Sequence, residues 1–203
     1  VQGTSVVVTS GPDDALVAQA RVLDPAHPPV DPVPAVSVDR AAQSEEHYAG
    51  ATDHPFPTCW VCGLARPDGY HLRPGLVGDA TSEQPQTACR WVVTDDALEA
   101  TGADTADAGE PLDAGAAAIP AASVWAALDC PGGWTALAGG RVAVLGRMTA
   151  QVSATPRVGD LCVVTGLLLG SQGRKAWTAT SIYRSDGVEM ARAAGTWITL
   201  PTG

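Results

Sequence analysis

One carboxylate stands in an apolar stretch of small residues. Asp129 lies in VWAALDCPGGW, residues 124–134, and is followed by a cysteine, a proline and two glycines. Burying a carboxylate without a partner is costly, so Asp129 is either a helix cap or the working group of a site. A partly desolvated carboxylate has a raised pKa and is a better general base. Gly132 and Gly133 would let a backbone approach a bound molecule closely.

Cys130 is a second candidate for the reacting group. Pro131 favours the first turn of a helix, which would make Cys130 the residue that caps that helix. A thiol at a helix N-terminus has a lowered pKa and can attack a thioester. The last histidine in the chain is His71, so a partner base would have to come from a distant segment. Cys130 can equally be a small buried residue of the core.

A CxxC motif is the third candidate. Cys59 and Cys62 lie in HPFPTCWVCGLARPDGYHLRPG, residues 54–75, together with His54 and His71. The spacing is that of zinc ligands, but one CxxC without a second CxxC or a close pair of histidines is half a site. Two thiols that anchor a tight turn against the core explain the motif without metal, and His54 is expected at the surface. We therefore expect no metal and no cofactor.

The remaining candidates are cations on an acidic chain. A net charge of −10 argues against binding to nucleic acid or to an anionic membrane. A few local cations can still hold a phosphate-bearing small molecule. Arg174 and Lys175 fall at a turn between two predicted strands, and Arg147 lies on the polar face of a third. Each is explained as well by an ordinary solvated turn or by an ion pair with one of the many acids.

Composition bounds the class of protein. The chain has 203 residues of which 45% are hydrophobic, enough for the core of one large domain. Its apolar runs are too short to span a membrane. Five cysteines at irregular spacing do not indicate a disulfide framework, so a reducing cytoplasm is the expected location.

The rest of the pattern predicts one helix followed by antiparallel strands. Helical spacing covers residues 120–140 and is interrupted at Pro131. Strands are predicted by apolar alternation and turn residues at 87–94, 142–153, 161–169, 176–184 and 188–200. Ahead of them come a hairpin at 4–23, a proline-rich linker from 24 and a short helix at 39–50, while the acidic segment 95–119 predicts a solvated loop.

Three segments in this order resemble the hotdog-fold acyl-CoA thioesterases. TCWVCGLARPDGYHL resembles the cysteine-containing segment that precedes the hotdog core, except that Gly69-Tyr70 replaces the usual Gly-Leu pair. VWAALDCPGGW resembles the hotdog helix, and GRKAWTATSIYRSDGVEMARAAGTWI the closing two strands. The resemblance covers roughly residues 56–200 and implies an α+β fold in which an antiparallel sheet wraps one central helix. Fold likeness alone does not fix function.

The resemblance implies a function and a domain plan. Asp129 matches the catalytic acid of phenylacetate-type and 4-hydroxybenzoyl-CoA-type thioesterases, which implies hydrolysis of an acyl-CoA with Asp129 as general base or nucleophile. Cys130, Gly132, Gly133, Arg147, Arg174 and Lys175 would contact substrate, helix-end amides would polarise the carbonyl, and the only cofactor would be the coenzyme A moiety of the substrate. A non-catalytic hotdog protein that binds acyl-CoA or serves as a structural or regulatory partner is the alternative.

We expect three regions in the chain. They are an N-terminal hairpin (1–23), a linker (24–55) and the hotdog domain (56–203). The hairpin sequence TSGPDDALVAQARVL is similar to YRSDGVEMARAAGTW near the end, so residues 1–23 would either extend the same sheet or be the remnant of a first hotdog half, giving a partial or double hotdog. Hotdog sites form between two helices, which implies a homodimer or a pseudo-dimer.

Overall fold

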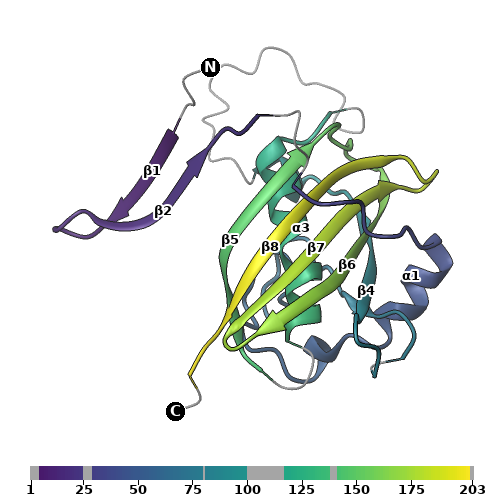
Figure 1. Ribbon diagram of the computed structural model, residues 1–203. Helices are drawn as coiled ribbons and strands as arrows, with labels where there is room; N and C mark the ends of the chain where they lie inside the picture. Colours follow the sequence, from purple (N-terminus) through teal and green to yellow (C-terminus); the bar gives the residue numbers. More distant parts are fainter. Residues whose placement is uncertain (1–4, 25–28, 80, 100–116, 138–140, 202–203) are drawn as a thin grey trace.

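A six-stranded antiparallel sheet packed on one long helix forms the body of the protein (Figure 1). The computed structural model describes residues 5–24, 29–79, 81–99, 117–137 and 141–201. The sheet order is β3-β4-β6-β7-β8-β5. The strands are β3 (Gly75–Leu76), β4 (Gln86–Val92), β5 (Ala143–Val152), β6 (Leu161–Gln172), β7 (Lys175–Arg184) and β8 (Glu189–Thr199). The five strands predicted from the sequence are therefore all present, at nearly the predicted bounds.

Alternation along β6 shows how the sheet is covered on both faces. Cys162 and Val164 are fully buried in the main core beneath the long helix. Val163, between them, points to the opposite face and packs with Ala41 and Ala88. Because neighbouring side chains of a strand point to opposite faces, a strand buried on both sides reads as a continuous apolar run.

Helix α3 (Ala121–Ala136) is the central helix expected from the sequence, but it is not interrupted. Pro131 lies inside it, so the predicted break and the predicted helix start at this proline are wrong. A proline in a helix removes one backbone hydrogen bond, and here the neighbouring sheet packs closely around the carbonyl of Pro131 itself. Thr87 Oγ1 donates to the Pro131 carbonyl oxygen at 2.7 Å. Gly166 of β6 makes room, since a Cβ there would lie 2.2 Å from the same oxygen.

The segment predicted as a linker is bound to the outer face of the sheet. Val33 is buried, its N–H donates to Ser181 Oγ at 3.0 Å, and its carbonyl accepts from Tyr183 Oη. Helix α1 (Val38–Glu45) follows, and the turn η1 (Ala49–Ala51) completes the region predicted as one helix.

The N-terminal hairpin stands apart from the six-stranded sheet. Strands β1 (Ser5–Ser10) and β2 (Ala15–Arg21) pair only with each other, and their side chains are exposed (Figure 1). The hairpin therefore forms where it was predicted but does not extend the main sheet, and its origin as a second hotdog half stays a prediction. Helix α2 (Asp96–Glu99) begins the predicted acidic loop, most of which lies outside the described residues.

Candidate functional site

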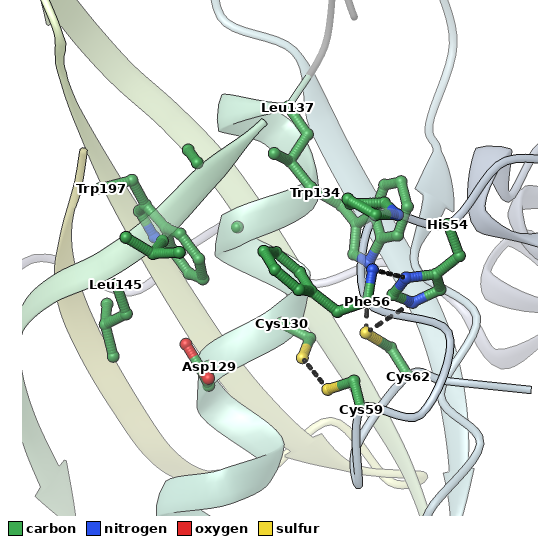
Figure 2. A pocket seen from close by; sticks show the side chains of 14 residues that line it. His54, Phe56, Cys59, Cys62, Asp129, Cys130, Trp134, Leu137, Leu145 and Trp197 are labelled. Atoms are coloured by element: carbon green, nitrogen blue, oxygen red, sulfur yellow. Dashed lines mark hydrogen bonds between the residues drawn. The ribbon is translucent and has the colours of Figure 1, made fainter. Parts of the chain in front are cut away.

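A cavity of about 240 Å³ opens between α3, the segment 54–62 and the sheet (Figure 2). Its walls are mainly apolar and aromatic, and its polar lining comes from one carboxylate, one histidine and three cysteines. The lining residues are His54, Pro55, Phe56, Cys59, Cys62, Asp129, Cys130, Gly133, Trp134, Leu137, Ala143, Val144, Leu145 and Trp197. An apolar hollow with a few convergent polar groups is the usual form of a small-molecule site.

Asp129 is the charged group of this cavity. Its Oδ1 atom is inaccessible to water and has no hydrogen-bond partner among the described residues. Burial raises the pKa of Asp129 from 3.8 to about 6, and the negative charge of nearby Cys59 adds to the rise. The carboxylate is thus held in the desolvated state that suits a general base.

The position of Asp129 in the helix corrects two expectations. Asp129 lies in the middle of α3, whose N-cap residue is Pro120, so it does not cap the helix. For the same reason, the N-terminal amides of α3 are not beside it and cannot polarise a carbonyl bound there. Any oxyanion donors must come from another element or from a second subunit.

Cys130 meets the two cysteines of the CxxC motif at the cavity wall. The Sγ atoms of Cys59, Cys62 and Cys130 all lie within 4.8 Å of one another, and those of Cys59 and Cys130 are 3.6 Å apart. Hydrogen bonding with the other two thiols lowers the pKa of the Cys59 thiol, whereas hydrogen bonding within the cluster together with burial raises the pKa of the Cys130 thiol. Cys130 is a buried thiol inside a helix rather than a helix cap, which argues against its role as nucleophile.

His54 lines the same cavity, so its predicted place at the surface is wrong. Its Nε2 atom lies 3.3 Å from Cys62 Sγ, and its Nδ1 atom accepts a hydrogen bond from the Phe56 N–H at 2.9 Å (Figure 2). His54 reaches the cavity from the segment that precedes β3. Both of its ring nitrogens are engaged in these contacts, so His54 is not free to act as a general base beside Asp129.

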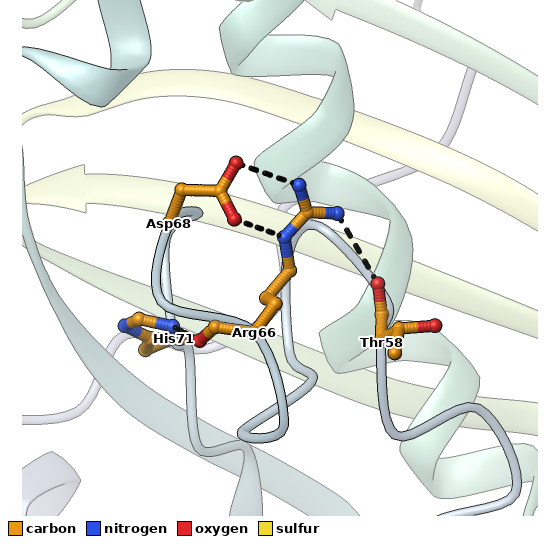
Figure 3. A network of polar contacts seen from close by, with 4 residues as sticks. All are labelled: Thr58, Arg66, Asp68 and His71. Atoms are coloured by element: carbon orange, nitrogen blue, oxygen red, sulfur yellow. Dashed lines mark hydrogen bonds and ion pairs between the residues drawn. The ribbon is translucent and has the colours of Figure 1, made fainter.

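The loop that carries the CxxC motif is held by a network of polar contacts (Figure 3). Arg66 pairs with Asp68 through two hydrogen bonds of 2.8 Å and donates to the Thr58 carbonyl at 3.2 Å. Its guanidinium also stacks over Trp60, 4.3 Å from the ring centroid. His71 Nε2 donates to the Arg66 carbonyl oxygen at 3.0 Å. These contacts fix the wall of the cavity opposite α3.

The two glycines of α3 serve packing against the sheet. A Cβ at Gly132 would lie 2.6 Å from Thr180 Oγ1, and one at Gly133 would lie 2.5 Å from the Trp197 ring. Gly133 also lines the cavity, but Gly132 faces β7 instead. Contact of both glycines with a substrate stays a prediction.

The three predicted cations lie outside the cavity wall. Arg174 is tied to the end of β8, where its Nε donates to the Thr199 carbonyl at 2.9 Å. Lys175 begins β7 and pairs with Ile198, which also pairs with Val144 of the cavity wall. The cationic turn therefore lies at the end of the sheet where the cavity opens. Arg147 instead lines a separate hollow between β5 and the end of β2.

Comparison with known proteins identifies the fold. No family model matches the sequence, and no curated protein matches it. The E. coli PaaI protein, from the phenylacetic acid degradation operon, matches with a TM-score of 0.51 at 11% identity over 82% of this chain and 97% of that one. A Streptococcus mutans protein bound to acetyl-CoA matches with a TM-score of 0.48 at 11% identity over 70% and 97% of the two chains. A hypothetical thioesterase of Streptococcus pneumoniae with coenzyme A matches with a TM-score of 0.45 at 11% identity, over 59% of this chain and 80% of that one.

The likeness to PaaI confirms the α+β hotdog fold predicted from the sequence. Among the described residues, no helix is both long and apolar enough to cross a membrane. Asp129 was found from the sequence because a lone acid in an apolar helix is conspicuous. The walls formed by Phe56 and Trp197 were missed, because these residues come from separate segments and carry no shared spacing.

Proposed function

We propose that the protein hydrolyses an acyl thioester of the acyl-CoA class, with Asp129 as general base or nucleophile. The observation that carries the proposal is the Asp129 carboxylate itself. It sits on the central helix of a hotdog sheet, at the wall of a cavity, with one oxygen buried and without a partner among the described residues. A structural carboxylate would be expected to have its buried oxygens hydrogen-bonded.

Two routes use this carboxylate. As a general base, Asp129 takes a proton from water while the water oxygen bonds to the thioester carbonyl carbon; the C–S bond then breaks and the thiolate leaves with a proton. As a nucleophile, the carboxylate oxygen bonds to the carbonyl carbon and expels the thiolate, and water then cleaves the mixed anhydride. Both give a carboxylic acid and a free thiol.

The size of the cavity favours a compact acyl group. About 240 Å³ equals roughly eight water molecules at about 30 Å³ each. A cavity of about 150 Å³ is known to accept benzene, so an aromatic acyl group fits within this one. The nucleotide end would lie outside the cavity, where Lys175 and Arg174 at the sheet end can contact phosphate.

A second subunit completes the site in this proposal. The mid-helix position of Asp129 leaves the carbonyl without helix-end amides from its own chain. A homodimer, or a pseudo-dimer formed with the N-terminal region, could supply such amides. The same mid-helix position favours the alternative, a non-catalytic hotdog protein that binds acyl-CoA.

The decisive experiment compares wild type with Asp129→Asn on short-chain, long-chain and aromatic acyl-CoAs, with free CoA measured by chromatography because five cysteines would confuse a thiol dye. Hydrolysis by wild type that falls at least about a hundredfold in the variant supports the proposal, since that is the usual size of a lost general base. Asp31→Asn, at an exposed position, is the matched control and keeps full activity. If both proteins bind CoA esters but neither hydrolyses them, the proposed enzymatic activity is wrong and the non-catalytic acyl-CoA-binding alternative is favoured.

A further inference from the structure

The CxxC motif acquires a third thiol only in the folded protein. Cys130 is 71 residues from Cys59 in the chain, yet their sulfur atoms are 3.6 Å apart. Cys62 joins them, with all three Sγ atoms within 4.8 Å of one another. Three sulfurs bonded to one tetrahedral zinc ion at about 2.3 Å lie about 3.8 Å apart, so this cluster needs only small adjustments to hold the ion.

We propose that Cys59, Cys62 and Cys130 together bind one zinc ion at the wall of the cavity. The half site recognised in the sequence is completed by the helix, which the spacing of the motif could not show. This proposal replaces the expectation of no metal and does not depend on thioester hydrolysis.

Hydrogen-bond donors around the sulfurs support thiolate ligands. Trp134 Nε1 lies 3.5 Å from Cys62 Sγ, and His54 Nε2 lies 3.3 Å from the same atom (Figure 2). Two N–H groups directed at the Cys62 sulfur suit a metal-bound thiolate, whose orientation and charge such outer hydrogen bonds commonly stabilise.

His54 is an outer partner and not a ligand. Its Nδ1 atom accepts from the Phe56 N–H at 2.9 Å, which places the ring hydrogen on Nε2. Nε2 therefore donates to Cys62 Sγ rather than binding metal. The three cysteines all line the cavity, so the fourth ligand comes from the cavity, as a water molecule or a solute.

The turn that presents Cys59 and Cys62 is fixed before any metal binds. Gly63 N–H donates to the Cys59 carbonyl oxygen at 2.9 Å. A Cβ at Gly63 would lie 2.4 Å from the Pro57 carbonyl oxygen, so only glycine closes this turn. A tight CxxC-Gly turn of this kind is a preformed half of a zinc site.

Metal analysis of protein purified under reducing, anaerobic conditions tests the proposal without any substrate. We expect about one zinc per wild-type chain, and less than about a tenth of that in Cys59→Ala, Cys62→Ala and Cys130→Ala. Cys162→Ala is the matched control, because Cys162 is a buried free thiol of β6 outside the cluster, and it keeps its zinc. His54→Ala keeps the zinc stoichiometry but binds about 10–100-fold more weakly, as expected for an outer partner.

Cobalt(II) reconstitution of the metal-free wild type guards against variants that fail to fold. Intense sulfur-to-cobalt charge-transfer bands and the visible bands of tetrahedral cobalt would support three thiolate ligands. A spectrum of hydrated cobalt only, zinc retained equally in all three cysteine variants, or a Cys59–Cys130 disulfide recovered in place of metal would each overturn the proposal. Because none of these readouts involves an acyl-CoA, their failure is distinct from failure of the proposed hydrolysis.

Discussion

Asp129→Asn should make the protein more stable while removing its proposed activity. The carboxylate is charged at neutral pH, although one of its oxygens is buried without a partner among the described residues. Asparagine has nearly the same shape and no charge, so it imitates the protonated form of Asp129. The variant therefore avoids the free-energy cost of desolvating a charge, which lowers the stability of wild type.

The size of the gain follows from the raised pKa of Asp129. A rise from 3.8 to about 6 corresponds to about 3 kcal/mol at about 1.36 kcal/mol per pKa unit. Because the folded state disfavours the charged form, wild type loses this stability as pH rises from below 3.8 to above 6. The variant should thus exceed wild type by up to about 3 kcal/mol at pH near 7.5, and by only about 0.5 kcal/mol at pH near 4.

Urea denaturation of both proteins at the two pH values measures this difference. The buffer should contain a reductant and a chelator, so that both proteins are compared metal-free and with reduced thiols. Asp31→Asn, an exposed control, should change the free energy of unfolding by less than about 0.5 kcal/mol at either pH. If Asp129→Asn is no more stable than wild type at the higher pH, the carboxylate has a partner, and the reasoning from its desolvation is wrong.

Three further predictions concern the surroundings of the site. Gly133→Ala should lower the free energy of unfolding by about 1–3 kcal/mol because its Cβ would overlap the Trp197 ring, whereas Gly170→Ala, with open space around it, should cost less than about 1 kcal/mol by thermal unfolding. Tyr48→Phe should cost about 1–2 kcal/mol in urea, because it leaves the buried Cys62 carbonyl without the 2.7 Å hydrogen bond from Tyr48 Oη. Lys175→Ala should raise KM for acyl-CoA and leave kcat unchanged if the cationic turn contacts the nucleotide, and an unchanged KM in steady-state assays would remove Lys175 from the site.

The sheet was predictable because its signals are local. Ser185-Asp186-Gly187 between two apolar runs specifies a hairpin from adjacent residues alone, and β7 and β8 pair across it. The central helix was less predictable than the sheet. Pro131 reads as a helix start because proline usually occupies a first turn, and its place inside a helix is seen only in the structure, where Thr87 and Gly166 of the sheet surround its carbonyl.

The candidate site depended on contacts that sequence spacing cannot encode. Asp129 was visible because its charge contrasts with its neighbours. The grouping of Cys130 with Cys59 could not be predicted from the sequence, because it depends on how the loop before β3 folds against α3. His54 was placed at the surface although its spacing from Cys62 hinted at a contact, because nothing in its local sequence indicates that Trp134 would pack against it.

The strand order also has a consequence for the folding pathway. Strands β6, β7 and β8 are joined by tight turns and can assemble early, because closing short loops costs little entropy. Strand β5 pairs with β8 rather than with its neighbour in the chain, and β4 must reach β6 across the whole of α3. Pairings between distant segments form slowly. We therefore expect the cavity, whose walls belong to α3, β5 and the segment 54–62, to be the last part of the native structure to form.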